Sequence, residues 1–277
     1  GVQLHGQIQH AVNEAAVEIH IGGNALVDFP LLGDELGGQP LYVGVKLVLL
    51  PAAMPNEYYT SDPLHGGFSP ASLKIPTMVG TVIAEFGEVQ DYGERSQLPV
   101  EEQERLVKEY YGEEGGQKIL DAFRKVYPNT PVIYATDLEN FFLADTVEYV
   151  KKKAAEASAP VYNYMFAKVF DYDGGRAAWH CADIPYFFHN AQLICHQPGW
   201  EELERVMCGA FVNFAKTGDP NVEGLPRWEP CKDGKMLTMV FDNTCYVNEN
   251  MQDELLPLVQ QYKPRFQFQG ATPEDED

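Results

Sequence analysis

The chain has 277 residues, enough for one large domain or two small ones, and a chain of this length buries about 75% of its unfolded surface. Hydrophobic residues make up 45% and charged residues 22%, which excludes a disordered, collagen-like or coiled-coil chain. The formal net charge of −21 repels phosphate backbones and anionic lipids, so we expect neither nucleic acid nor a membrane surface as a partner.

Two features bear on the compartment of the chain. No window approaches the run of about 18 apolar residues that a membrane-spanning helix needs, and the chain begins at Gly1 without an initiator Met or an apolar leader. We expect a processed chain or a piece of a longer protein, in which missing targeting signals carry little information on the compartment. The cysteines include no C-x-x-C pair, which predicts reduced, mostly buried thiols, as in a cytoplasmic protein, rather than a disulfide framework or a zinc site. They are Cys181, Cys195, Cys208, Cys231 and Cys245.

The first part of the chain predicts two strands. Residues 1–40 carry no motif and stay unassigned. The apolar run 43–50 predicts a short buried strand, and a loop rich in Pro, Gly and Asn follows over residues 51–70. Residues 74–81 form a second apolar run that is closed by Gly and Thr, which predicts a strand that ends in a turn.

The middle of the chain alternates helices with a strand. Apolar residues at helical spacing predict helices over 100–111 and 115–126, both with acidic first turns that suit the helix dipole. A further helix over 143–157 completes a helical insert or cap, residues 100–157. Residues 160–166 predict a β-rich strand behind a proline.

The last third of the chain predicts one long helix, a strand and a second helix. Apolar residues over 201–216 follow helical spacing and stop at a Gly-Asp-Pro sequence, a helix C-terminal signal. Residues 236–241 predict a strand, and residues 253–262 predict a helix in which Pro257 fits only in the first turn. Residues 266–277 are expected to form an acidic, disordered tail.

This alternation predicts an α/β fold with a mostly parallel sheet flanked by helices, over residues 41–265. In such sheets the chemistry lies on loops beyond the carboxyl ends of strands. Glu85 stands among apolar residues after the strand at 74–81, and His180 follows the strand at 160–166 and a loop. A carboxylate that fixes the tautomer of a histidine makes an oriented general base, and such a pair needs a nucleophile.

Four segments, in this order, resemble motifs of the type-B carboxylesterases, the family that includes cholinesterases and bacterial para-nitrobenzyl esterases. The resemblance covers roughly residues 50–245 and implies an α/β-hydrolase fold, of which the chain is expected to hold the carboxyl-terminal portion. The matching segments are Ile75 to Glu85 (IP-x-x-x-GT-x-x-x-E), Pro160 to Phe166 (PVY-x-Y-x-F), His180 to Phe188 (H-x-x-E-L-P-Y-x-F, with Asp183 in place of Glu), and Phe211 to Asn221 with Trp228 to Pro230.

The resemblance implies Glu85 as the acid and His180 as the base of a Ser-His-Glu triad, and in α/β-hydrolases the serine precedes both in the chain. No G-x-S-x-G sequence lies upstream of Glu85. Ser69 is excluded because the next residue, Pro70, has no N–H to offer to an oxyanion hole. The other upstream serines lack the glycine frame of a nucleophile elbow. We therefore expect no nucleophile in this chain, and place it in a part of the protein before residue 1 or in a partner chain.

Several nearby residues receive a role as well. Phe141 and Phe142, between two helical segments, are predicted to form part of the wall of the substrate pocket. Cys181, next to His180, is predicted to be a small buried packing residue, and His189 to be structural. The resemblance implies no metal and no cofactor.

The sequence therefore predicts a carboxylic ester hydrolase that acts on a small-molecule ester and requires an amino-terminal part or a partner chain. Two alternatives stay open: a non-catalytic protein-binding module on the same fold, and a truncated, inactive fragment. The presence of both Glu85 and His180 favours the enzyme, because a binding module has no need of an acid and a base at these two places.

Overall fold

The central sheet is mostly parallel in the computed structural model, which describes residues 62–87, 92–138 and 142–263. Its strands are β1 (Thr77–Val82), β2 (Val161–Phe166), β5 (Leu237–Phe241) and β6 (Tyr246–Glu249), in the order β1-β2-β5-β6. The first three run parallel, and β6 pairs antiparallel with β5. A separate antiparallel ribbon joins β3 (Val169–Phe170) and β4 (Arg176–Ala177). The predicted α/β class is therefore confirmed.

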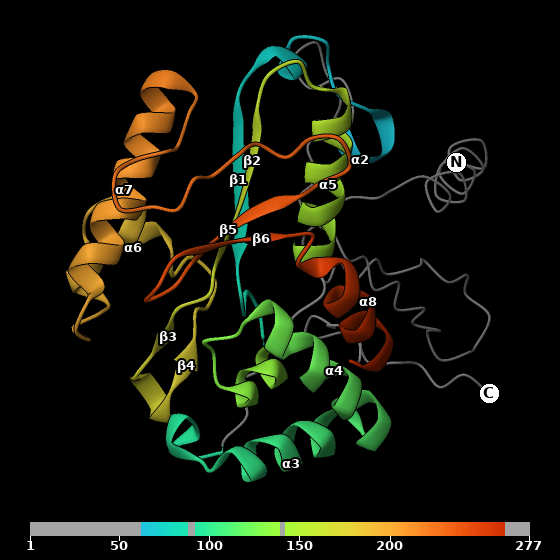
Figure 1. The fold of residues 1–277 in the computed structure, drawn as a ribbon, viewed down its shortest axis with the longest axis vertical. Coiled ribbons are helices and arrows are strands. Elements are labelled where there is room, and N and C mark those ends of the chain that lie inside the picture. Colours follow the sequence, from blue (N-terminus) through green and yellow to red (C-terminus); the bar gives the residue numbers. More distant parts are fainter. Residues whose placement is uncertain (1–61, 88–91, 139–141, 264–277) are drawn as a thin grey trace, which may run out of the picture. The chain divides into compact units, whose positions relative to one another are not determined.

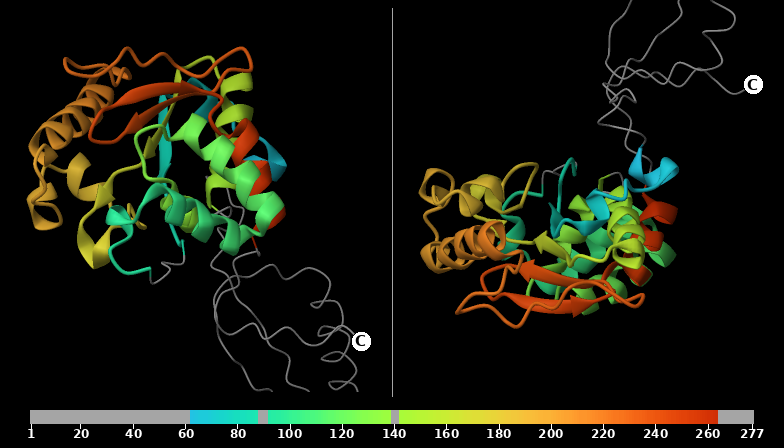
Figure 2. Two further views of the ribbon diagram at one scale, coloured as in Figure 1. Left: turned by 60° about the horizontal axis from the view of Figure 1, so that its bottom comes forward. Right: turned by 90° about the horizontal axis from the view of Figure 1, so that it is seen from above.

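Helices cover both faces of this sheet (Figure 1). They are α2 (Pro63–Gly66), α3 (Val100–Tyr111), α4 (Glu113–Val126), α5 (Phe142–Glu156), α6 (Ile184–Phe187), α7 (Trp200–Thr217) and α8 (Gln252–Tyr262). Helices α6 and α7 lie on one face and α5 on the other, and two further views show the same separation (Figure 2). The α3–α4 pair lies beyond the carboxyl ends of β1 and β2, and α4 packs against α8.

The long helices lie where the apolar spacing predicts them, with ends that differ by at most two residues. In α4, for example, Ile119, Leu120 and Phe123 are fully buried, as expected for residues that share one face of a helix. One expectation is wrong: α8 begins at Gln252, so Pro257 lies in the second turn and not in the first. The missing N–H weakens that turn, and the burial of the apolar side chains around it holds the helix in place.

The strand predictions agree with the sheet in three cases. β1, β2 and β5 correspond to the predicted strands at 74–81, 160–166 and 236–241. β6 was not predicted, because its residues are half-buried at the edge of the sheet and show no alternation of apolar and polar side chains. The predicted strand at 43–50, the unassigned residues 1–40 and the acidic tail 266–277 lie outside the described residues.

The strand register brings the carboxyl ends of the parallel strands to one edge of the sheet. Val82 at the end of β1 lies beside Phe166 of β2, and Phe166 lies beside Phe241 of β5. Loops that follow these strands therefore start next to one another, and this edge is where an α/β sheet holds its chemistry. Both loops with a candidate acid or base start here.

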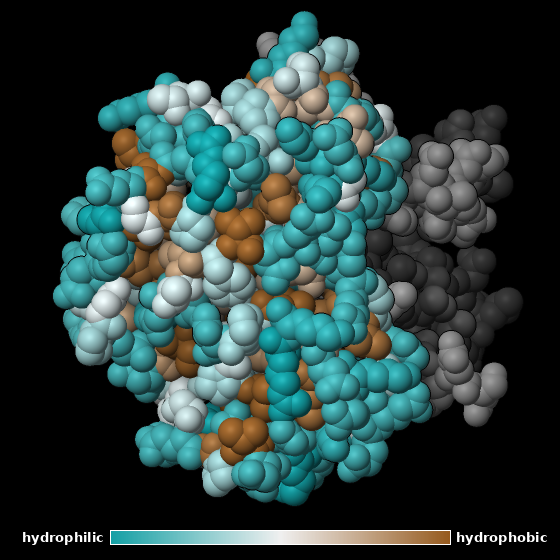
Figure 3. All heavy atoms as spheres, viewed as in Figure 1, coloured by the Kyte–Doolittle hydropathy of each residue, from teal (hydrophilic) through white to brown (hydrophobic). Residues whose placement is uncertain are grey.

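The surface agrees with the composition. On the face turned to the viewer in Figure 1, most residues are hydrophilic, and hydrophobic residues form smaller areas between them (Figure 3). None of the helices in the described ranges combines the length and the apolar character that spanning a membrane requires.

Candidate active site

Two loops at the carboxyl edge of the sheet are joined through their backbones. The first continues from β1 to Glu85, and the second returns from the β3–β4 ribbon to His180. The N–H of Ala84 donates to the carbonyl of Ala178 at 3.0 Å, and the N–H of His180 donates to the carbonyl of Glu85 at 3.0 Å. These two bonds fix the loops in register, so the side chains of Glu85 and His180 leave the backbone side by side.

The side chains of Glu85 and His180 form a direct contact. Nδ1 of His180 lies 2.6 Å from Oε2 of Glu85, while Oε1 of Glu85 accepts the backbone N–H of Val82 at 3.1 Å. The glutamate side chain is 11% exposed and the imidazole 51% exposed. Within the described residues, Nε2 of His180 has no hydrogen-bond partner. A carboxylate held at both oxygens thus orients the ring and leaves Nε2 available to a reacting group.

Aromatic rings cover one side of the imidazole. The Phe86 ring stacks on the His180 ring with centroids 4.6 Å apart and planes 27° apart. Phe142, the first residue of α5, lies 5.2 Å from the Phe86 ring and 6.3 Å from the imidazole. Phe142 thus lies near the candidate base but does not line the cleft beside Glu85 and His180, so its role in the pocket wall stays a prediction, and Phe141 lies outside the described residues.

A cleft of about 310 Å³ opens beside the Glu85–His180 pair. Three of its lining residues were not singled out by the sequence: Asp137, Arg176 and Trp179. They come from different segments without a recognisable motif, and the Arg176 guanidinium lies 4.8 Å over the Trp179 ring. The complete lining consists of Ala84, Glu85, Phe86, Gly87, Asp137, Arg176, Ala177, Trp179 and His180.

A second carboxylate lies close to the pair. Asp183 is 9% exposed and accepts the hydroxyl of Tyr164 at 2.8 Å. Burial raises the pKa of Asp183, and the negative charge of Glu85 raises it further, against the hydrogen bond from Tyr164. The Tyr164 ring also explains Gly80 in the matched motif, because a Cβ on Gly80 would lie 2.5 Å from this ring.

The prediction for Cys181 is wrong. Its side chain is exposed, because the residue takes a left-handed backbone conformation (φ 67°) that turns it outward directly after His180. Partial desolvation of the sulfur, together with the negative charges of Asp183 and Glu85, raises the pKa of this thiol, which disfavours a reactive thiolate. None of the five cysteines forms a disulfide, and only Cys195 and Cys231 are buried, so the expectation of mostly buried thiols is also wrong.

A second histidine–carboxylate pair lies between His189 and α7, and no motif in the sequence indicates it. Nδ1 of His189 lies 2.7 Å from Oε2 of Glu204, on α7. The other oxygen of Glu204 accepts the N–H of Ala191 at 2.7 Å. In the described ranges, no group of three or more His, Cys, Asp and Glu side chains is arranged to hold a metal ion.

A sequence model of the Carboxylesterase family matches residues 39–257. This chain belongs to the carboxylesterase family. It is 30% identical over 144 residues to Pyrethroid hydrolase Ces2a of Mus musculus, and the aligned region covers 48% of this chain and 24% of that protein. It is 26% identical over 135 residues to Bile salt-activated lipase of Mus musculus, and that aligned region covers 43% of this chain and 22% of that protein.

A solved structure shows the same relationship. An esterase from anaerobic Clostridium hathewayi, which can hydrolyze aliphatic aromatic polyesters, matches with a TM-score of 0.70 and 31% identity. The match covers 77% of this chain and 42% of that one, and the matched parts of the two curated relatives amount to about a quarter of their length. The expected α/β-hydrolase fold is thereby confirmed.

Proposed function

We propose that this protein hydrolyses carboxylic esters, with His180 as general base and Glu85 as the acid that orients it. The observation that carries the proposal is the 2.6 Å contact between Nδ1 of His180 and Oε2 of Glu85 at the carboxyl edge of the sheet. Membership in the carboxylesterase family supports it.

In the proposed reaction, a serine hydroxyl at Nε2 of His180 attacks the ester carbonyl while the imidazole takes the hydroxyl proton. The imidazolium then gives this proton to the leaving alcohol, and an acyl-enzyme forms. Water attacks the acyl-enzyme with the same base and releases the acid. Glu85 stabilises the charged ring throughout and keeps its proton on Nδ1.

We place the nucleophile and the oxyanion-hole donors outside residues 62–263, in an amino-terminal part of the protein or in a partner chain. Ser69 does not serve, because its Oγ accepts the N–H of Ser72 at 3.2 Å and Pro70 follows it. The substrate class we propose is a small carboxylic ester with an apolar or aromatic group. The aromatic faces of Phe86 and Trp179 suit such a group, and the cleft of about 310 Å³ limits its size.

The test compares two preparations with a para-nitrophenyl ester and a serine-reactive fluorophosphonate probe. One is the 277-residue chain, and the other is the protein isolated from its source through a carboxyl-terminal tag. We expect the isolated protein to hydrolyse the ester and to carry the probe on a serine outside residues 62–263. The 277-residue chain should give little turnover and no label.

Two results would overturn parts of the proposal. A stoichiometric burst from the 277-residue chain alone would contradict the placement of the nucleophile outside it. If the isolated protein neither hydrolyses the ester nor reacts with the probe, the proposed esterase activity is contradicted, and a binding module on the same fold is favoured. The same preparation with His180→Ala tests the base directly.

A further inference from the structure

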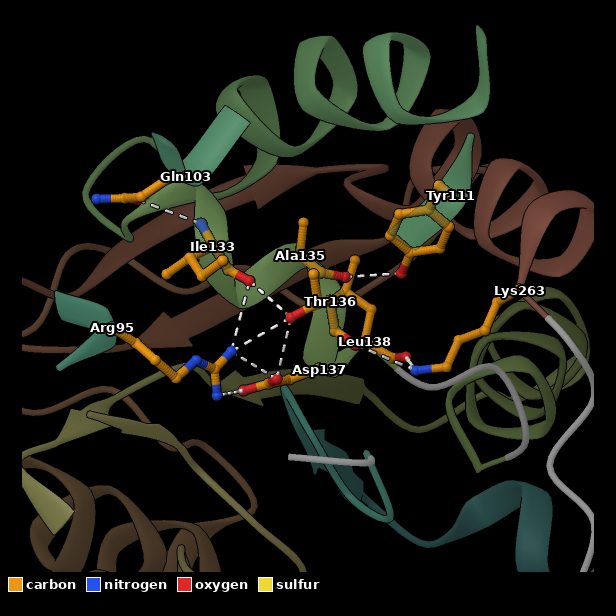
Figure 4. Close-up of polar contacts among 9 residues, drawn as sticks. All are labelled: Arg95, Gln103, Tyr111, Ile133, Ala135, Thr136, Asp137, Leu138 and Lys263. Carbon is orange, nitrogen blue, oxygen red and sulfur yellow. Dashed lines mark hydrogen bonds and ion pairs between the residues drawn. The ribbon is translucent and has the colours of Figure 1, made fainter. Parts of the chain in front are cut away.

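A buried helical turn, η3 (Val132–Asp137), connects segments that lie far apart in the chain (Figure 4). All six of its residues are buried. Polar groups from three other segments of the chain bind it. These are the Arg95 guanidinium on η2 (Arg95–Gln97), the Gln103 amide and the Tyr111 hydroxyl on α3, and the Lys263 ammonium after α8.

The strongest of these contacts is an ion pair between Arg95 and Asp137. The two guanidinium nitrogens lie 3.0 and 2.7 Å from the two carboxylate oxygens, and both side chains are only 1% exposed. The same guanidinium donates to the Thr136 hydroxyl at 3.3 Å. Desolvation offsets most of the attraction in such a buried pair, so stability alone explains it poorly. A bidentate contact also fixes the relative orientation of the guanidinium and the carboxylate, and it holds the last residues of η3 in one position.

The turn η3 contacts both loops of the candidate active site. On the acid side, the carbonyl oxygen of Asp137 lies 2.0 Å from the place that a Cβ on Gly87 would take. The N–H of Gly87 closes a turn onto the carbonyl of Ala84, and Glu85 lies inside that turn. Any shift of Asp137 is therefore transmitted to the backbone that carries the acid.

On the histidine side, the hydroxyl of Tyr134 lies 2.3 Å from the place that a Cβ on Gly175 would take. Gly175 directly precedes β4, which leads to His180. Asp137 also lines the cleft that Glu85 and His180 line. One buried segment thus abuts the backbone of both loops and forms part of the cleft wall.

We propose that Arg95 and Asp137 are positioning residues for the Glu85–His180 pair. By holding η3 against Gly87 and Gly175, their ion pair sets the spacing of the two loops and the wall of the cleft. The inference rests on the proposed function for its catalytic consequence, whereas the spacing itself can be measured in the chain without any ester.

The first test reads the tautomer of His180 by NMR in the 277-residue chain, through the ¹⁵N shifts of both ring nitrogens. His180→Ala assigns the signals. In the unmodified chain, we expect the neutral ring to carry its proton on Nδ1, against Glu85. In Asp137→Asn and in Gly87→Ala, the population with the proton on Nε2 should rise, because the loops separate.

The matched controls remove polar contacts that do not reach the loops. Tyr111→Phe removes another bond to η3, at 2.7 Å, and Arg105→Gln removes two exposed ion pairs of α3, to Glu102 and Glu109. Both should leave the His180 tautomer unchanged even where they lower the thermal stability. If a single variant does not fold, the double variant Arg95→Met with Asp137→Leu replaces it. The double variant fills the same space with apolar side chains and leaves no buried charge without a partner.

The second test measures hydrolysis by the isolated protein. A displacement of about 1 Å lowers turnover by about 10²-fold, so Asp137→Asn should reduce kcat with little change in KM. An unchanged tautomer in Asp137→Asn, in Gly87→Ala and in the double variant would overturn the proposal. Unmodified protein without ester hydrolysis would instead overturn the proposed function, because the tautomer measurement does not depend on it.

Discussion

The molecule contains two histidine–carboxylate pairs with nearly equal geometry and different surroundings. Nδ1 lies 2.6 Å from the carboxylate oxygen in His180–Glu85 and 2.7 Å in His189–Glu204. The first pair lies on two loops at the carboxyl edge of the sheet, under a stacked phenylalanine and beside a cleft. The second pair braces the turn before α7, with His189 74% exposed and Glu204 5% exposed.

The distance from Nδ1 to the carboxylate oxygen therefore does not distinguish an oriented general base from a histidine with a structural role. Glu204 holds the buried N–H of Ala191 with its second oxygen, and His189 covers its first oxygen at the surface. His189 has no lining role in the described clefts. The cleft and the place at the strand ends, not the hydrogen bond, mark His180 as the candidate base.

The largest expected effect is on turnover of the isolated protein. Glu85→Gln and His180→Ala should each lower kcat by about 10⁴-fold, because the ring loses its orienting carboxylate or the base itself. His189→Ala is the matched control, and it should keep the rate of the unmodified protein. Hydrolysis of a para-nitrophenyl ester measures both. Near-normal rates in Glu85→Gln would remove Glu85 from the mechanism, and a strong loss of rate in His189→Ala would contradict a purely structural role of His189.

A third pair, Arg95–Asp137, extends the comparison to the case where both partners are buried. Burial raises the pKa of Asp137, and the Arg95 guanidinium opposes this rise. Arg95→Met leaves the carboxylate without its partner and should lower the free energy of unfolding by about 3–5 kcal/mol. Arg105→Met, at a pair whose arginine is 58% exposed, should change it by at most about 1 kcal/mol. Urea unfolding measures both free energies. Equal losses in Arg95→Met and Arg105→Met would contradict the larger cost that we expect for breaking the buried Arg95–Asp137 pair.

Replacing Glu204, which pairs with His189 before α7, should have an intermediate effect on the free energy of unfolding. Glu204→Leu removes the acceptor of the buried Ala191 N–H, and leaving that donor unsatisfied should cost about 1–3 kcal/mol. His189→Ala removes only an exposed ring and should change the free energy of unfolding by less than about 0.5 kcal/mol. Similar losses in the two variants would show that the ion pair, and not the backbone bond, is the stabilising contact.

The sequence was sufficient for elements that depend on local pattern. The helical spacing in α4 and the strand at β2 follow from neighbouring residues, and the parallel order follows from their alternation. Glu85 and His180 were found because each lies in a segment that resembles a carboxylesterase motif, and the resemblance implied that they act together. The sequence did not show how His180 reaches Glu85, which depends on the antiparallel β3–β4 ribbon and on the backbone bonds between the two loops.

The sequence was insufficient for contacts that depend on tertiary packing. Arg95 and Asp137 are 42 residues apart and lie in no periodic pattern, so nothing local pairs them. The exposure of Cys181 depends on one left-handed backbone angle. Glu204 reads as one of several acidic residues at the start of a helix, and only the fold of the preceding turn shows that it is buried.

The smallest expected effect concerns Asp183, the carboxylate beside the candidate acid. Its pKa is raised by burial, so the folded state binds its proton more tightly than the unfolded state does. The stability from the protonated carboxyl is complete below the ordinary pKa of 3.8 and is lost as the pH rises through the higher pKa of the folded state. Asp183→Asn removes this titration and keeps an acceptor for the Tyr164 hydroxyl.

The stability of the unmodified chain relative to Asp183→Asn should therefore fall as the pH rises from about 3 to about 7, by about 1.4 kcal/mol per unit of pKa shift. Urea unfolding at a series of pH values measures it. Asp233→Asn, at an exposed turn, is the control and should show no such trend. A relative stability that rises with pH would mean that a hydrogen-bonded, charged Asp183 is favoured. The carboxyl would then carry a negative charge in the folded state.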